Sequence, residues 1–187
     1  MINFLNETLR QLFVTRMSDD LADPSQVSFD FPDDDFRNQV KTQGKNALNV
    51  CLVDLRENRT LASPAEAAGA SSVSGGVLPQ RRVDCHYLIS AWSPATRSVE
   101  PAMDEHELLY KAMSILMDTE PLAPRRVYNG KAIPKHFPAT FRNAEFPVVL
   151  LPVERFPKIA EFWSASKAAH WKPTLHLVVT LPAIPAR

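Results

Sequence analysis

The chain has 187 residues, 45% of them hydrophobic and 22% charged, and its formal net charge at pH 7 is zero. A chain of this length buries a substantial core, and this composition is typical of a soluble globular protein, so we expect a single domain over residues 1–187. A neutral total disfavours a dedicated nucleic-acid-binding protein, because the neutralisation of phosphates requires a net basic surface.

The first part of the chain shows helical and then strand-like patterns. Apolar residues recur every three to four positions over 2–13, which predicts a helix that ends near residue 17. Alternation predicts a short strand at 27–31, and the three aspartates at 33–35 are expected to form a polar turn or loop. The run at 47–55 has apolar residues at both parities, which favours a strand covered on both faces.

The middle of the chain combines a low-complexity segment with a strand and a helix. Residues 61–78 are rich in Ala, Ser and Gly and have little to bury, so we expect a long mobile loop there. The alternating segment at 82–92 is expected to pair antiparallel with the strand at 47–55. An amphipathic helix is expected at 104–117, with acidic residues in its first turn, where the helix dipole favours them.

The last part of the chain is rich in proline. Residues 125–147 are expected to be irregular, with a small hairpin at 127–131, because Asn-Gly is a turn signal. The apolar segment at 146–152 is bracketed by prolines, which favours a short or edge strand. A helix with an apolar side at 156–163 and a final strand at 174–181 follow. This order of elements predicts an α/β (α+β) fold, in which a mixed or antiparallel sheet is flanked by helices.

Nothing in the sequence indicates a membrane or secretory protein. The longest apolar runs fall short of the roughly 20 residues that span a bilayer. The first residues lack the basic start and the apolar block of a secretory signal. Cys51 and Cys85 fall inside expected strands, where a reduced thiol packs as a small hydrophobic group. We therefore expect synthesis in the cytoplasm and no membrane partner.

The residues that could carry chemistry form no catalytic pattern. Cys85 and His86 are neighbours in a strand and point to opposite faces, so we expect a core cysteine and a structural or solvated histidine. His106 has no second histidine at helical ligand spacing, and His176 is interpreted as a packing residue. We expect no catalytic, cofactor-binding or metal-binding residues, no cofactor and no enzyme activity. A small thiol- or metal-dependent enzyme that uses Cys51, Cys85 or His86 is the alternative, and it requires a thiol with perturbed chemistry.

The charged residues are unevenly distributed. Residues 1–120 carry 11 Lys and Arg against 18 Asp and Glu, whereas residues 121–187 carry 10 against 3. The two segments either neutralise each other within the fold or lie on different faces and attract a neighbouring subunit. Head-to-tail contacts of the second kind are heterologous and form rings when the rotation closes.

Two pairs of basic residues are the candidate interface residues, and each pair is either solvated surface charge or a set of salt-bridge partners across an interface. These residues are Arg81, Arg82, Arg125 and Arg126.

Several pieces of the sequence resemble one known family. They are the opening helix at 1–9, the strand at 46–58, the strand-then-helix block of 83–92 with 107–110, and the closing helix-to-strand step of 162–165 with 171–175. In these residues the chain resembles the tail-terminator, or cap, proteins of extracellular contractile injection systems. Those systems are phage-tail-like particles with a sheath around a rigid tube. The length and composition of the segment at 61–78 are individual, and some relatives carry a further C-terminal segment, whereas this chain stops soon after its last strand.

The resemblance implies a tail-terminator-like fold and a structural role without catalysis. It implies a homohexameric ring at the end of the particle distal to the baseplate, where the protein stops polymerisation of the inner tube and anchors the last sheath ring. The implied partners are further copies of the chain and the inner-tube and sheath proteins of a particle that can be released. An adaptor at the neck or baseplate of a phage-like tail is the remaining alternative, because it shares the physics of ring formation.

Overall fold

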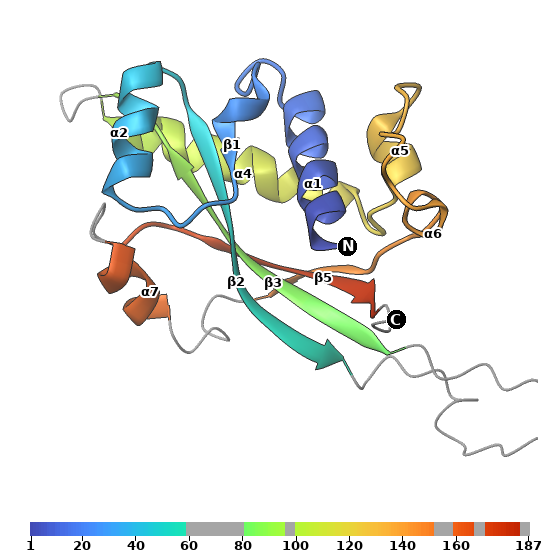
Figure 1. The fold of residues 1–187 in the computed structure, drawn as a ribbon. Coiled ribbons are helices and arrows are strands. Elements are labelled where there is room, and N and C mark those ends of the chain that lie inside the picture. Colours follow the sequence, from blue (N-terminus) through green and yellow to red (C-terminus); the bar gives the residue numbers. More distant parts are fainter. Residues whose placement is uncertain (59–80, 96–99, 152–158, 167–170, 184–187) are drawn as a thin grey trace, which may run out of the picture.

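The structure, a computed structural model, describes residues 1–58, 81–95, 100–151, 159–166 and 171–183. Within these residues five strands form one mixed sheet in the order β1-β2-β3-β5-β4. Helices α1 and α4 lie over one face of this sheet, and α7 lies on the opposite side (Figure 1). This arrangement confirms the predicted α/β fold with a sheet flanked by helices. The extent of the domain over residues 1–187 stays a prediction.

The N-terminal helix α1 (Ile2–Arg16) confirms the predicted amphipathic helix. Its buried side chains, Leu5, Leu9, Leu12 and Phe13 among them, form one stripe that faces the core, as a helical period requires. A short 3-10 helix η1 (Pro24–Gln26) leads into β1 (Val27–Ser28). β1 pairs parallel with β2 and is shorter than the strand expected at 27–31.

The polar turn or loop expected at 33–35 is wrong, because these aspartates begin helix α2 (Asp34–Gln43). The side chain of Asp33 accepts a hydrogen bond from the backbone N–H of Phe36 at 3.0 Å and so caps the helix. Asp34 and Asp35 lie in the first turn, where the positive end of the helix dipole favours negative charge. Gly44 ends the helix with a φ of 63°, a left-handed conformation that suits glycine.

Strands β2 (Ala47–Asn58) and β3 (Arg82–Trp92) pair antiparallel, as predicted, with Cys51 opposite Leu88. The expectation that β2 is covered on both faces holds only for its first half. Beyond an irregularity in register between Leu52 and Asp54, the side chains become exposed. The reason is that the second half of β2 runs past the helices that cover the sheet (Figure 1).

The sheet is completed by β5 (Leu175–Pro182), which pairs antiparallel with β3, and by β4 (Val148–Leu151), which pairs antiparallel with β5. β4 lies at the edge of the sheet, as its flanking prolines predict. The helix α7 (Ile159–Ser166) confirms the apolar helix predicted at 156–163 from residue 159 on and extends three residues further. Residues 156–158 of that prediction lie outside the described residues.

Helix α4 (Pro101–Asp118) begins three residues earlier than expected, with Pro101 in its first turn. Asp104 is therefore the acidic residue of that turn, rather than a cluster of acids. The hairpin expected at 127–131 is wrong. Asn129 and Gly130, whose φ values are 27° and 82°, follow the short helix α5 (Pro124–Tyr128) instead of joining two strands. A second short helix, α6 (Ala139–Arg142), lies in the same proline-rich segment.

The main core lies between the sheet and helices α1, α4, α5 and α6, and it includes Cys85, Tyr87 and Ile89 from one face of β3. A smaller core on the other side joins α2 and α7 to the sheet through Phe36, Val40, Ala47, Trp92 and Trp163. The loop predicted at 61–78 lies outside the described residues. A search of the described residues found no helix that is long and apolar enough to cross a membrane.

Candidate assembly surfaces

Helix α4 exposes a stripe of large apolar side chains. Met103, Tyr110 and Met117 have exposed fractions of 68%, 66% and 66%. They are seven residues apart, so each lies about 20° around the helix from the previous one, and the three form a line roughly 21 Å long. Large apolar side chains that line up on a surface mark an interaction site more often than scattered ones do. We call these three residues the α4 stripe.

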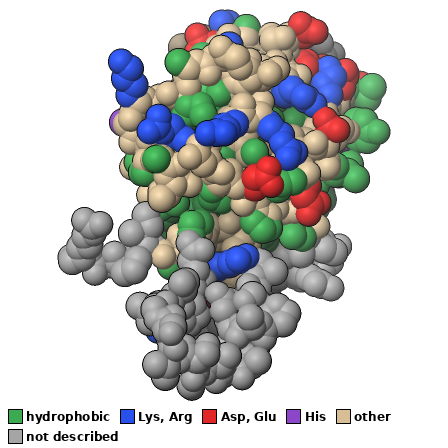
Figure 2. Space-filling model, turned by 90° about the vertical axis from the view of Figure 1, so that its right-hand side faces the viewer, with side chains coloured by type: hydrophobic (Ala, Val, Ile, Leu, Met, Phe, Trp, Pro, Cys, Tyr) green, Lys and Arg blue, Asp and Glu red, His purple; other side chains and the backbone are tan. Residues whose placement is uncertain are grey.

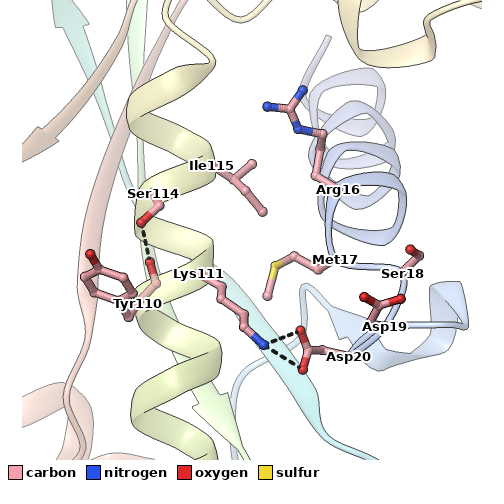
Figure 3. Close-up of a pocket in the computed structure, with 9 residues that line it drawn as sticks. All are labelled: Arg16, Met17, Ser18, Asp19, Asp20, Tyr110, Lys111, Ser114 and Ile115. Atoms are coloured by element: carbon pink, nitrogen blue, oxygen red, sulfur yellow. Dashed lines mark hydrogen bonds and ion pairs between the residues drawn. The ribbon is translucent and has the colours of Figure 1, made fainter.

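A groove of about 320 Å³ lies beside this stripe, between α4 and the chain that leaves α1 (Figure 3). Lys111 crosses the groove from α4, and its Nζ lies 3.0 Å from a carboxylate oxygen of Asp20. Glu107 binds the same ammonium group at 2.9 Å. These two carboxylates raise the pKa of Lys111, so the lysine is charged. The ion pair of Lys111 with Asp20 therefore spans the groove.

Basic side chains gather on another face, around α5 and α6. Residues 121–144 contain five Lys and Arg and no Asp or Glu. The view onto this side of the molecule shows blue side chains spread across it (Figure 2). Arg125, Lys131 and Lys135 are exposed and make no ion pair within the described residues, whereas Arg126 contacts Glu145 at 3.0 Å. We call residues 125–142 the basic segment.

The four predicted interface arginines fall on two different elements. Arg125 and Arg126 are exposed on α5 and belong to the basic segment. Arg81 is exposed just before β3, and its carbonyl accepts a hydrogen bond from Ala183 at 2.7 Å. Arg82 is half-buried at the start of β3, opposite Asn58. Their role in an interface stays a prediction.

The thiols lack the environment of a nucleophile. Cys85 is fully buried in the main core and Cys51 is buried on the other face of the sheet. Burial raises the pKa of each thiol to about 11, so almost none of either is thiolate at neutral pH. A catalytic cysteine needs the opposite shift. The described residues also hold no group of three or more metal-ligating side chains.

The structure brings together two histidines that local sequence patterns do not connect. His86 Nδ1 and His176 Nε2 lie 3.0 Å from each other. The two rings are on the face of the sheet that Cys85 does not occupy. His86 is a structural histidine, so the alternative of a solvated one is wrong. In the register of β3 and β5, His176 is opposite Leu88, which places it diagonal to His86. Burial lowers the pKa of both rings. The contact between the two rings depends on how β3 and β5 are aligned, and local sequence patterns do not reveal that alignment.

Comparison with known protein families adds a match that spans nearly the whole chain. The profile of the family described as the Pvc16 N-terminal domain matches residues 5–187. The chain belongs to the Pvc16 N-terminal domain family. A comparison with curated proteins gave no match.

Two solved structures share the fold of this Pvc16 N-terminal domain. One is the sheath/tube terminator of PVC, an extracellular contractile injection system, in its extended state. It is 17% identical, with a TM-score of 0.59, and the match covers 97% of this chain and 56% of the terminator. The other is the tube-terminating cap of the anti-feeding prophage, with the same identity and TM-score, and here the match covers 98% and 55%. The chain thus spans about half the length of each, and at this identity the likeness establishes the fold.

Proposed function

We propose that the chain is a structural terminator of a contractile injection system. In this role it closes the end of the inner tube distal to the baseplate, stops tube polymerisation and anchors the last sheath ring, as a ring of six copies. The observation that carries the proposal is the fold shared, over 97% and 98% of this chain, with two proteins that are themselves a sheath/tube terminator and a tube-terminating cap. The family resemblance in the sequence points to the same role.

The physical task of a terminator needs no chemistry. One side must fit the growing end of the tube, and the other side must offer no surface on which the next subunit can add. Edge strands are the usual templates for unwanted addition. Here the exposed half of β2 carries an irregular register and the charged residues Asp54, Arg56 and Glu57, and β4 has only four residues. Both features discourage strand-by-strand growth.

The proposed partners follow from this role. They are further copies of the chain, the inner-tube protein and the sheath protein, with no nucleic acid, membrane or cofactor. The protein is made and assembled in the cytoplasm and becomes part of a particle that can be released. The buried thiols, whose pKa values are raised to about 11, support a role without catalysis over the thiol-dependent alternative.

Electron microscopy of particles tests the proposal. Particles assembled without the chain are expected to have tubes of uncontrolled length or loose sheaths, and addition of the chain is expected to restore a uniform length. Tubes of normal, uniform length without the chain would contradict the terminator role. A gold label on the chain separates the remaining alternative, since a label at the neck or the baseplate would indicate an adaptor.

A further inference from the structure

We propose that adjacent copies of the chain contact each other through the α4 stripe of one copy and the basic segment of the next. This inference rests on the proposed function for the closure of the assembly into a ring. It goes beyond that function because it assigns the two surfaces and predicts a head-to-tail contact. The occupant of the α4 stripe is therefore a second copy of this chain.

The first argument is charge complementarity. Residues 100–120, which contain α4, carry six Asp and Glu and one Lys, whereas residues 121–144 carry five Lys and Arg and no acid. On α4, Glu107 lies about 40° around the helix from Met103 and Asp118 about 100° from Met117, both on the side of the stripe that borders the groove. Both are exposed, with side-chain exposed fractions of 70%. Within one copy Glu107 pairs with Lys111 at 2.9 Å and Asp118 with Arg16 at 2.5 Å. The α4 surface thus offers a line of apolar side chains with exposed carboxylates along one side, each of which a partner cation can also approach from solvent.

The second argument is that the cations of the basic segment have no ion-pair partner within the described part of the chain. Arg125, Lys131 and Lys135 are exposed, and none of them forms an ion pair with a described residue. Cations gathered in one surface segment repel one another unless counterions or a partner neutralise them. The α4 region of a second copy, which carries six acids against one lysine, offers carboxylates that can neutralise them.

The third argument is geometric. The basic segment contacts the first turns of α1, since His136 lies 3.0 Å from Glu7 and the rings of Phe137 and Phe4 are 5.0 Å apart. The groove beside the α4 stripe lies instead at the other end of α1, next to Arg16 (Figure 3). A helix of 15 residues is about 22 Å long. The two surfaces therefore lie apart on one copy, which favours a heterologous contact that can repeat around an axis.

Charge reversal of the basic segment is the first test. Lys131→Glu with Lys135→Glu is expected to weaken self-association of the purified chain about tenfold or more, because like charges then face each other. Native mass spectrometry and sedimentation velocity measure the assembly. The matched control is Lys41→Glu with Lys45→Glu, which reverses two exposed lysines elsewhere. The inference would be overturned if both variants weakened self-association equally, or if neither variant weakened it.

Charge exchange is the second test, and it identifies the partner surface. Glu107→Lys with Asp118→Lys is expected to weaken association, and a chain with all four reversals is expected to regain it. Met103→Ser with Tyr110→Ser and Met117→Ser is expected to weaken it as well, whereas the control Leu55→Ser with Val149→Ser is not. Circular dichroism checks that each variant is folded. If each pair of reversals abolishes association in a folded chain, and the chain with all four reversals also fails to associate, the two surfaces do not meet.

The outcomes separate this inference from the proposed function. Rings that the lysine reversal disrupts, together with tubes of normal length in particles without the chain, would leave the contact standing and remove the terminator role. Reversal variants that assemble and cap tubes like the unmodified chain would remove the contact and keep the role. α4-stripe variants that still form rings but no longer cap tubes would assign the stripe to the tube or sheath, against this inference.

Discussion

Lys172 and Glu105 form an ion pair that joins the segment before β5 to the first turns of α4. The two side chains have exposed fractions of only 15% and 18%. Lys172 also donates a hydrogen bond to the carbonyl of Ala91 at 3.3 Å, and its ammonium group lies 4.7 Å from the ring centroid of Trp92. Glu105 in turn accepts a hydrogen bond from the backbone N–H of Ser93 at 3.1 Å. The pair thus ties the end of β3 to α4 and to β5.

We predict that Glu105→Gln lowers the free energy of unfolding by about 1–3 kcal/mol, because the ammonium group of Lys172 then lies in a shielded site without a carboxylate partner. Urea unfolding measures the change. The matched control is Glu107→Gln, which removes the carboxylate of an exposed pair with Lys111 and is expected to cost less than about 1 kcal/mol. Similar losses in the two variants would show that shielding does not strengthen the inner pair.

The sequence predicted the elements that local patterns determine. The period of the apolar residues determined α1, and alternation determined β3 and its pairing with β2. Prolines on both sides determined the short edge strand β4. In these segments the pattern of burial is repeated over many residues, so a single unusual residue does not change the prediction.

The missed features depend on single residues or on contacts between distant segments. Helix α2 has few apolar residues, and its start depends on one capping side chain, Asp33. The His86–His176 pair depends on the register of two strands that are 90 residues apart. The α4 stripe also requires the structure, because periodicity alone does not distinguish exposed Met103 and Met117 from apolar side chains of the core.

The cap of α2 gives a second prediction. Asp33→Ala is expected to lower the free energy of unfolding by about 0.5–2 kcal/mol, since the backbone N–H of Phe36 loses its acceptor. Asp33→Asn keeps an oxygen acceptor at the cap and is expected to retain most of the stability. Thermal and urea unfolding measure both variants. If Asn and Ala are equally destabilising, the loss comes from the negative charge rather than from the hydrogen bond.

The thiols give a third prediction. Cys51 and Cys85 are expected to react slowly with a thiol reagent at pH 8 in the native chain and rapidly in urea, because burial raises the pKa of each thiol to about 11. The unfolded chain releases these protons near pH 9, so the stabilising contribution is complete below pH 9 and is lost as pH rises toward 11. The slope is about 1.4 kcal/mol per pH unit for each thiol.

The same thiols separate the structural role from the enzymatic alternative. A chain with Cys51→Ala and Cys85→Ala is expected to cap tubes, once circular dichroism shows that it is folded. Its unfolding free energy is also expected to depend less on pH above 9 than that of the unmodified chain. Loss of capping in the folded double variant would give the thiols a functional role and contradict the proposal.

The buried histidine pair gives the last prediction, a dependence of stability on mild acid. Burial lowers the pKa of His86 and His176 below the ordinary value of 6.5. Arg56 acts on His86 in the same direction, and Asp54 and Asp84 oppose it. Below pH 6.5 the unfolded chain therefore binds protons that the folded chain excludes. The contribution of the two neutral rings to the free energy of unfolding is complete above pH 6.5. It is lost as the pH falls through the lowered pKa values.

We expect His86→Gln to flatten the fall in the free energy of unfolding between pH 7 and pH 5.5, because one of the two titrating rings is gone. Urea unfolding at several pH values across this window measures the slope, and the window stays above the range in which most carboxylates titrate. The control is His106→Gln, which removes an exposed ring of α4 instead of a ring of the buried pair. An equal flattening by both variants would show that the effect does not come from the buried pair. An identical slope in the His86→Gln variant and the unmodified chain would mean that the pair is protonated as easily in the folded chain as in the unfolded one.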